Sequence, residues 1–178
     1  MWTAFIGFMG SGKSTAVRQM RQTTGRVAYD LNPEIERRCG RGIAELLERD
    51  GETGLRRLEL EALSELEAAP ALLLATTSGS VESADAVRLL RRRGVVFWLD
   101  APWEVLRARL QRQPDAVQPW LDQEGWEGLR CLYARRLRLY AAAADFRLRT
   151  DRLAPEDVAQ TALLRGLIWR RRLARIPS

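Results

Sequence analysis

The segment from Gly7 to Ser14, G-F-M-G-S-G-K-S, constrains this chain more than any other, because it fits the pattern G-x-x-x-x-G-K-[ST] completely. An apolar run over residues 2–7 leads into the segment, and a helical pattern follows from about Ser14. A strand, a glycine-rich turn and a helix in this order surround a phosphate with backbone N–H groups and a helix N-terminus. The segment therefore predicts a phosphate-binding loop in an α/β protein.

Lys13 is the only lysine in a chain that contains 28 arginines. Lysine carries a compact point charge on a flexible stem, whereas arginine ends in a wide planar fork, so the two are not interchangeable in a tight loop. We expect the Lys13 ammonium to lie beside the β- and γ-phosphates of a nucleotide. Because Lys13 is the single exception to the use of arginine, it indicates that the loop still binds a nucleotide.

Predicted strands and helices alternate along the chain, which favours an α/β fold with a central parallel sheet. We expect residues 1–178 to form one domain of the P-loop NTPase type, with three layers, α/β/α. The expected strands are 2–7, 27–29, 72–75, 95–99 and 146–149. The expected helices are 14–25, 33–39, 43–49, 54–68, 82–92, 102–111, 125–142 and a terminal helix from Pro155.

Residues 112–124 contain two prolines and show no helical period, which indicates a loop. Such a loop is long for a compact domain, and loops of this length are frequently active-site lids. We therefore expect a mobile lid over about residues 112–124.

Composition limits the chemistry and the partners. Histidine is absent, so acid–base chemistry has to use carboxylates or the substrate itself. The net charge of +6 suggests nucleic acid as one alternative partner, but acidic residues are interspersed and no aromatic residues alternate with the arginine runs. We expect neither a nucleic-acid partner nor a membrane partner, since no apolar run approaches the length of a membrane span.

The N-terminus and the cysteines indicate a cytoplasmic location. The first residues lead directly into the predicted loop as a buried strand and leave no room for a signal peptide. Cys39 and Cys131 lack metal-ligand spacing, so we expect two reduced, partly buried thiols.

Asp30 follows the second predicted strand, and ligands of doubly wound sheets bind at the carboxyl ends of strands. Its carboxylate is placed to reach Mg²⁺ or its waters, together with the Ser14 hydroxyl. The alternative is that Asp30 caps the helix that follows. Taken alone, Arg56 and Arg136 on predicted helices are more typical of solvated arginines than of ligands.

The ordered set of motifs resembles the shikimate kinase family of small P-loop kinases over nearly the whole chain. The resembling segments are Gly7–Thr15, the D-L-N-P run from Asp30, residues 40–46 and 50–59, Q-P-W-L at 118–121, R-R-L-R-L-Y at 135–140 and T-D-R at 150–152. The resemblance implies a monomeric ATP- and Mg²⁺-dependent kinase. Its acceptor would be a hydroxyl of a small carboxylated molecule, with shikimate the default, in aromatic amino acid biosynthesis.

The resemblance also implies a role for each matched residue. Lys13 and Asp30 are the catalytic pair, and Ser14 and Asp30 hold the metal. The predicted nucleotide-binding residues are Gly10, Ser11, Gly12, Lys13, Ser14, Thr15, Gln118 and Arg152, the last beside the adenine. The predicted acceptor-binding residues are Asn32, Arg56, Gly79 and Arg136, with the two arginines gripping the carboxylate.

Four positions depart from the family pattern. Asn32 stands where the family has a second aspartate, Thr77 and Ser78 stand in a three-glycine loop, and Gln118 replaces the lid arginine that meets the transferring phosphate. Arg107, Arg109 or Arg112 is a possible replacement for that cation. These departures leave open a diverged nucleotide-binding relative with a different substrate or weak activity. A further alternative is a nucleoside monophosphate kinase, whose arginines would grip a second phosphate.

Overall fold

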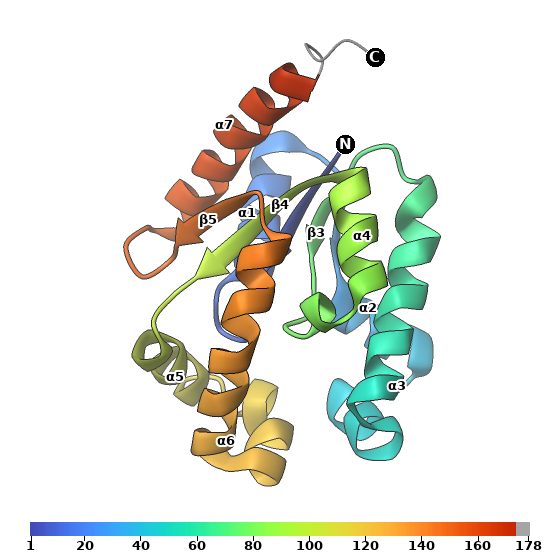
Figure 1. Cartoon of the computed structure of the whole chain (residues 1–178), viewed down its shortest axis with the longest axis vertical. Coiled ribbons are helices and arrows are strands. Elements are labelled where there is room, and N and C mark those ends of the chain that lie inside the picture. Colours follow the sequence, from blue (N-terminus) through green and yellow to red (C-terminus); the bar gives the residue numbers. More distant parts are fainter. Residues whose placement is uncertain (174–178) are drawn as a thin grey trace.

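The computed structural model describes residues 1–173, and the side chains of all of these except residues 114–119 and 170–173. Five strands form one sheet in the order β2-β3-β1-β4-β5, and every neighbouring pair is parallel (Figure 1). The strands are β1 Trp2–Ile6, β2 Ala28–Asp30, β3 Leu73–Ala75, β4 Gly94–Asp100 and β5 Phe146–Arg149. The prediction of an α/β fold with a central parallel sheet is confirmed.

Helices cover both faces of the sheet, which gives the predicted three layers. Side chains alternate along β1, so Trp2, Ala4 and Ile6 enter one core and Phe5 enters the other. Helices α1 (Lys13–Thr24) and α7 (Pro155–Leu173) pack on the face of Phe5. The other face is covered by α2 Leu31–Cys39, α3 Ile43–Glu65, α4 Ala84–Arg93, α5 Trp103–Gln111 and α6 Pro114–Ala143.

Two short 3₁₀ helices, η1 Leu66–Ala68 and η2 Ser80–Glu82, join the longer elements. The two helices expected over 43–49 and 54–68 form the single element α3, which is kinked at Gly51, where φ is 66° and ψ is −176°. Glycine adopts this left-handed conformation without the steric cost that other residues meet. The break between the two expected helices is therefore present as a kink.

The loop expected over residues 112–124 is wrong, because α6 begins at Pro114 and continues beyond this segment, with its kink at Gly125. Proline is compatible with the first turn of a helix, since the N–H group that it lacks would have no intrahelical partner there. Trp120 is buried in the core on the side of α5 and α6. Burial of this indole stabilises a helical segment that the local sequence does not favour.

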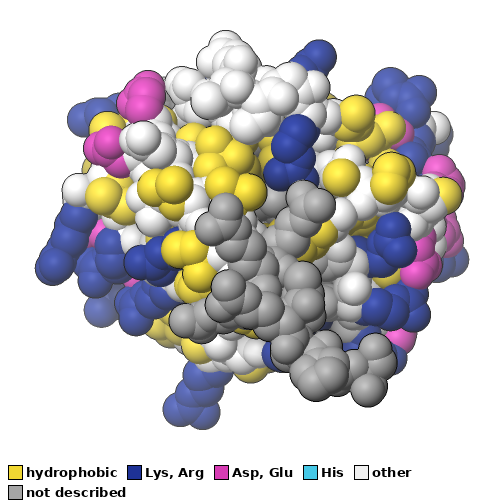
Figure 2. All heavy atoms as spheres, turned by 90° about the horizontal axis from the view of Figure 1, so that it is seen from above, with side chains coloured by type: hydrophobic (Ala, Val, Ile, Leu, Met, Phe, Trp, Pro, Cys, Tyr) yellow, Lys and Arg dark blue, Asp and Glu magenta, His cyan; other side chains and the backbone are white. Residues whose placement is uncertain are grey.

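The surface seen in Figure 2 bears on the nucleic-acid alternative. Among the side chains coloured there, most arginines lie toward the rim, and acidic side chains lie mainly at the upper left and the right. The expected absence of a nucleic-acid partner stays a prediction. Within residues 1–173, no helix combines the length and the apolar character needed to cross a membrane. Both cysteines are free; Cys39 is half-buried as expected, whereas the expected partial burial is wrong for Cys131, which is exposed on α6.

Phe97 on β4 is the centre of an aromatic row in the core beneath α1 and α7. Its ring stacks on Phe5 at 5.7 Å and on Phe146 at 5.3 Å between centroids. We expect Phe97→Ala to lower the free energy of unfolding by about 3–5 kcal/mol, because it removes a fully buried ring and leaves a cavity. Urea denaturation followed by far-UV circular dichroism measures this change.

The matched control is Leu164→Ala, since Leu164 is a large apolar side chain of α7 that is 57% exposed. This variant should stay within about 0.5 kcal/mol of the parent. If Phe97→Ala lowers the free energy of unfolding by less than about 1 kcal/mol, the aromatic row does not contribute the expected stability to this core.

Candidate functional site

The turn between β1 and α1 leaves the N-terminus of α1 open to an anion. Gly12 is the N-cap residue with φ of 96°, and it supplies no capping side chain. The first turn of α1 contains no acidic residue either. The first N–H groups of the helix therefore have no side-chain acceptor and keep the partial positive charge of the helix dipole. This geometry is suited to a phosphate group.

Lys13 points back into the turn. Its Nζ donates hydrogen bonds to the carbonyl oxygens of Gly7, at 2.8 Å, and Phe8, at 3.1 Å. The pKa of Lys13 is lowered to about 8, chiefly by burial; Asp30 opposes this change, Arg136 adds to it, and Glu59 opposes it. Burial therefore disfavours the charged form of Lys13, and an anionic ligand beside it would raise its pKa again.

Asp30 ends β2 and serves as the N-cap of α2, because its carboxylate accepts a hydrogen bond of 3.3 Å from the Asn32 backbone N–H. The capping alternative is therefore present in the structure. The same carboxylate is close enough to Lys13 to raise the pKa of that ammonium. Asp30 therefore lies near the phosphate loop and also caps α2.

Ser14 and Asp30 offer the oxygen ligands that Mg²⁺ prefers. Ser14 is exposed in the first turn of α1. Within the part of the chain that the structure describes, no group of three or more His, Cys, Asp or Glu residues is arranged to hold a metal. A magnesium site here would need phosphate oxygens and waters besides these two residues, which is the usual arrangement in kinases. The donor set therefore fits Mg²⁺ bound together with a nucleotide.

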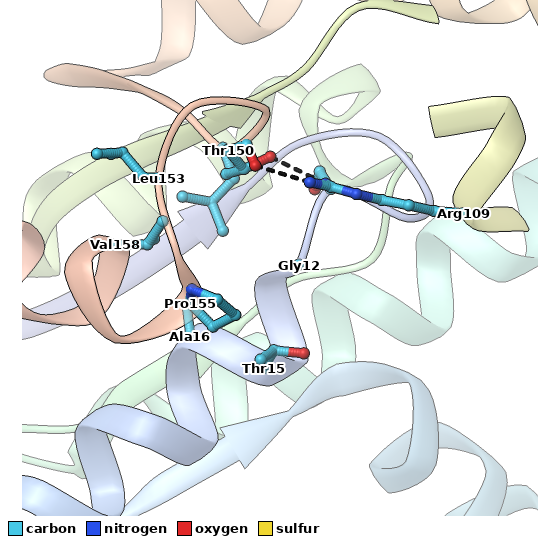
Figure 3. Close-up of a pocket in the computed structure, with 10 residues that line it drawn as sticks. Gly12, Thr15, Ala16, Arg109, Thr150, Leu153, Pro155 and Val158 are labelled. Carbon is cyan, nitrogen blue, oxygen red and sulfur yellow. Dashed lines mark hydrogen bonds between the residues drawn. The ribbon is translucent and has the colours of Figure 1, made fainter. Parts of the chain in front are cut away.

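A cavity of about 220 Å³ opens beside the phosphate loop (Figure 3). It lies between the loop, the end of β4 and the start of α7, and it has a largely apolar wall. The residues that line it are Ser11, Gly12, Thr15, Ala16, Leu99, Arg109, Thr150, Leu153, Pro155 and Val158. An apolar slot next to a phosphate site is suited to the base and ribose of a nucleotide.

Arg109 of α5 closes one side of this cavity and points toward Thr150, as Figure 3 shows. Its guanidinium donates to the Thr150 carbonyl at 2.7 Å, to the Thr150 hydroxyl at 3.1 Å and to the Gly10 carbonyl at 3.2 Å. Arg109 thereby ties the phosphate loop to the segment after β5. These contacts hold it beside the nucleotide cavity.

Two of the predicted nucleotide-binding residues, Arg152 and Gln118, are not placed at this cavity by the structure. Arg152 does not line the cavity, and its side chain is mostly exposed, with Nε 3.9 Å from an Asp151 carboxylate oxygen. The Gln118 side chain lies outside the described residues. The roles predicted for both residues stay predictions.

A second cavity of about 320 Å³ lies on the other side of the loop. Its wall combines polar groups from the segment after β3 with residues of α2, α3 and α6. The residues that line it are Met9, Asn32, Glu36, Gly42, Ile43, Ala44, Leu55, Arg56, Glu59, Thr77, Ser78 and Trp120. Asn32 and Arg56, two of the predicted acceptor-binding residues, therefore face one common space.

A buried network holds Arg56 at this cavity. The carboxylate of Glu59, which is fully buried, accepts hydrogen bonds from the Arg56 guanidinium and the Thr77 hydroxyl. Arg56 also donates to the Thr77 hydroxyl at 3.2 Å. Gly79 lies flat against the guanidinium, and an added Cβ there would be 2.0 Å from its central carbon. A side chain at position 79 would therefore displace the Arg56 guanidinium.

Arg136 of α6 is fully buried and is not among the residues that line either cavity. Its Nε and one terminal nitrogen each donate to the Glu82 carboxylate at 2.9 Å. The other terminal nitrogen lies 3.4 Å from the Ser78 hydroxyl. The Trp120 ring covers the guanidinium, with its centroid 6.0 Å from the central carbon. Arg56 and Arg136, the two arginines predicted to bind the acceptor's carboxylate, are called the clamp below. They share Glu82, since Arg56 Nε is 3.4 Å from the same carboxylate.

The sequence reasoning missed Glu59 and Glu82 as site residues, and it named Arg109 only as a possible replacement for the lid cation, not as a wall of the nucleotide cavity. The spacing of Arg56 and Glu59, three residues apart on a helix, was a usable signal because such residues are neighbours on one face. Glu82 and Arg109 gave no comparable signal, since their partners come from distant segments.

Comparisons with known proteins agree with this arrangement. The family model described as "Shikimate kinase" matches residues 9–165. The shikimate kinase of Chromohalobacter salexigens is 40% identical over 161 residues, which cover 90% of this chain and 88% of that protein. The shikimate kinase of Tolumonas auensis is 38% identical over 165 residues, covering 91% and 95% respectively.

A solved structure extends the likeness to three dimensions. Shikimate kinase from Acinetobacter baumannii, in complex with shikimate, superposes with a TM-score of 0.85 at 35% sequence identity. The match covers 97% of this chain and 94% of that chain.

The lowered pKa of Lys13 predicts a pH-dependent affinity for ATP. Because the pKa lies near 8, below its usual value of 10.5, the ammonium loses its proton as the pH rises through 8. We expect the ATP affinity in magnesium-free buffer to fall by about tenfold per pH unit above that value, with uptake of one proton on binding. Calorimetric titration at pH 7 and 9.5 in buffers of different ionisation enthalpy measures both quantities.

Lys13→Arg is the matched control, because arginine stays charged throughout this range. Its affinity should be severely reduced at pH 7 and should not change between the two pH values. A parent protein whose affinity is equal at both pH values would contradict the assignment.

Proposed function

The chain belongs to the shikimate kinase family and is an ATP-dependent phosphotransferase, and on this basis we propose that it transfers the γ-phosphate of ATP to a hydroxyl of shikimate. The product would be shikimate 3-phosphate, an intermediate of aromatic amino acid biosynthesis. One observation carries the proposal: the phosphate loop separates the two cavities. Ser11 and Gly12 line the nucleotide cavity, whereas Met9 lines the other. A phosphoryl group held by the loop would thus lie between nucleotide and acceptor.

The groups around the loop support phosphoryl transfer by positioning and electrostatics, which supply most of the catalysis in such reactions. The open N-terminus of α1 would bind the phosphates, and Lys13 would exchange its bonds to the Gly7 and Phe8 carbonyls for phosphate oxygens. The remaining nucleotide ligands in the proposal are Gly10, Ser11, Gly12, Ser14, Thr15, Gln118 and Arg152.

Ser14 and Asp30 would hold Mg²⁺ against the phosphates. When bound, the ion neutralises charge that develops on the transferring group. Asp30 would keep its cap on α2, which fixes the carboxylate at the end of β2. The metal position would then depend on the end of β2 and on the cap that orients the Asp30 side chain.

The second cavity would hold the acceptor. Arg56 and Arg136 would bind its carboxylate, because arginine forks pair with carboxylates in a bidentate way. Asn32 and Gly79 would contact the ring hydroxyls. Asn32 carries no charge and cannot accept the hydroxyl proton as an aspartate can, so its role would be orientation. We also infer that residues 112–124 act as a lid and that the protein works as a cytoplasmic monomer.

The assay is ADP release with shikimate as the acceptor, with the phosphorylated product identified by mass spectrometry. Arg56→Ala tests the site within this assay. We expect this variant to raise the KM for shikimate by about 10–100-fold, the range for losing a charge-assisted hydrogen bond, while the KM for ATP stays within twofold.

Arg57→Ala is the matched control, since Arg57 is the neighbouring arginine with a side chain that is 71% exposed. It should leave both constants unchanged. No ADP release with shikimate from a protein that binds ATP normally would refute the proposed acceptor. An equal effect of Arg56→Ala on the KM values of both substrates would show that Arg56 does not bind the acceptor specifically.

The departures from the family pattern favour a second candidate, a relative with reduced or altered activity. Thr77 supports it, because this residue fills a family glycine position and bonds to Glu59. The double variant Asn32→Asp with Gln118→Arg restores two family charges. We expect kcat/KM for shikimate to rise by at least about tenfold, equal to about 1.4 kcal/mol of transition-state stabilisation.

Steady-state kinetics of the parent and the double variant decide between the candidates. A parent with an ordinary kinase rate of about 1–100 s⁻¹ and no gain in the variant would show that these departures are neutral.

A further inference from the structure

The carboxylate-binding edge of Arg136 is already occupied by this chain. Glu82, the last residue of η2, receives hydrogen bonds from Nε and one terminal nitrogen of Arg136, both at 2.9 Å. Two parallel N–H···O bonds of this kind are the arrangement in which an arginine binds a free carboxylate. Glu82 therefore stands in the structure where a carboxylate ligand of Arg136 would be expected.

Three arginines converge on Glu82. Besides Arg136, Arg56 Nε lies 3.4 Å from one carboxylate oxygen, and a terminal nitrogen of Arg135 lies 3.9 Å from the other. Partial burial opposes ionisation of Glu82, but the hydrogen bonds and charges of the arginines outweigh it and hold the pKa of this carboxyl below its usual value. Glu82 is thus a fixed negative charge at the centre of the predicted clamp.

The clamp has little positive charge left for another anion. Arg56 is paired with the buried carboxylate of Glu59, and Arg136 is paired with the partly buried carboxylate of Glu82. Arg136 does not line the cavity of Asn32 and Arg56, and the Trp120 ring covers it. An acceptor carboxylate that enters this cavity meets a neutralised site.

A displaced Glu82 carboxylate would have a second ion-pair partner, Arg135. Arg135 lies beside it, and the Arg135 side chain is 66% exposed. A rotation of the Glu82 side chain from Arg136 toward Arg135 would keep the carboxylate paired while it frees the Nε edge of Arg136. Exchange of one carboxylate for another on Arg136 then leaves no buried charge without a partner, which is the costly outcome.

We propose that Glu82 is an internal competitor for the acceptor's carboxylate, so that this residue sets both the affinity for the acceptor and the preference for acids over neutral analogues. The inference rests on the proposed function, in which Arg56 and Arg136 bind that carboxylate. The opposing explanation is an ion pair that orients Arg136 for the acceptor. The two explanations predict opposite signs when Glu82 loses its charge.

The test measures the affinity of Glu82→Gln for shikimate and for methyl shikimate, the ester without a carboxylate, by calorimetry. We expect shikimate to bind about tenfold more tightly than to the parent, equal to about 1.4 kcal/mol, while the affinity for the ester stays within twofold. Glu67→Gln is the matched control, because Glu67 forms an exposed ion pair with Arg92 outside the site. It should change neither affinity.

A shikimate affinity of Glu82→Gln that is unchanged, weaker or undetectable overturns the inference, and so does an equal gain for the ester. ATP binding verifies that the variant is folded. If it is not, Glu82→Asp decides, because the shorter carboxylate cannot reach both Arg136 donors. This variant should also bind shikimate more tightly, and an equal or weaker affinity overturns the inference.

ADP release separates this result from the proposed function. Phosphorylation of shikimate by the parent, without tighter binding by Glu82→Gln, leaves the proposed function standing and refutes the role of Glu82. Tighter binding of shikimate by Glu82→Gln, without phosphorylation in either protein, supports the role of Glu82 and refutes the proposed function.

Discussion

The common direction of the five strands is the constraint on which the rest of the structure depends. Because every strand is parallel to its neighbours, the segments that follow the strands meet at one edge of the sheet. The phosphate loop follows β1, Asp30 ends β2, Thr77–Gly79 follows β3, and Thr150 follows β5. Residues that are up to about 140 positions apart in the chain are brought together by this one property of the backbone. An antiparallel pairing of any of these strands would carry its polar segment to the opposite edge.

Features that depend on local sequence were predictable. The loop pattern, the apolar strands and the glycine at the kink of α3 each act through a few consecutive residues, and each is present where it was expected. The segment 112–124 was not predictable in this way, because its helical state goes with the burial of Trp120 against elements distant in sequence. Two prolines and a missing period describe the local preference only, and tertiary packing overrode that preference.

The acceptor side shows a second limit of the sequence. Resemblance identified Arg56 and Arg136, but it could not show which groups the arginines already contact. Glu82 meets Arg136 across 54 positions, and its bond depends on how η2 packs against α6. Glu59, in contrast, shares a helix with Arg56, and their contact follows from helical geometry. A buried arginine is always paired with something, and the sequence alone does not reveal whether the partner is a ligand or the protein itself.

The position of the only lysine also gives the chain a built-in reporter of local opening. An endoprotease that cleaves only after lysine has one target in the whole sequence, the bond between Lys13 and Ser14. That bond lies in the first turn of α1, and the Lys13 side chain is held by two carbonyl groups of the preceding turn. Cleavage therefore requires the junction of loop and helix to unfold locally, and its rate follows the population of that open state. A single cut would thus record the dynamics of the phosphate loop, without a label and without interference from the other strands and helices.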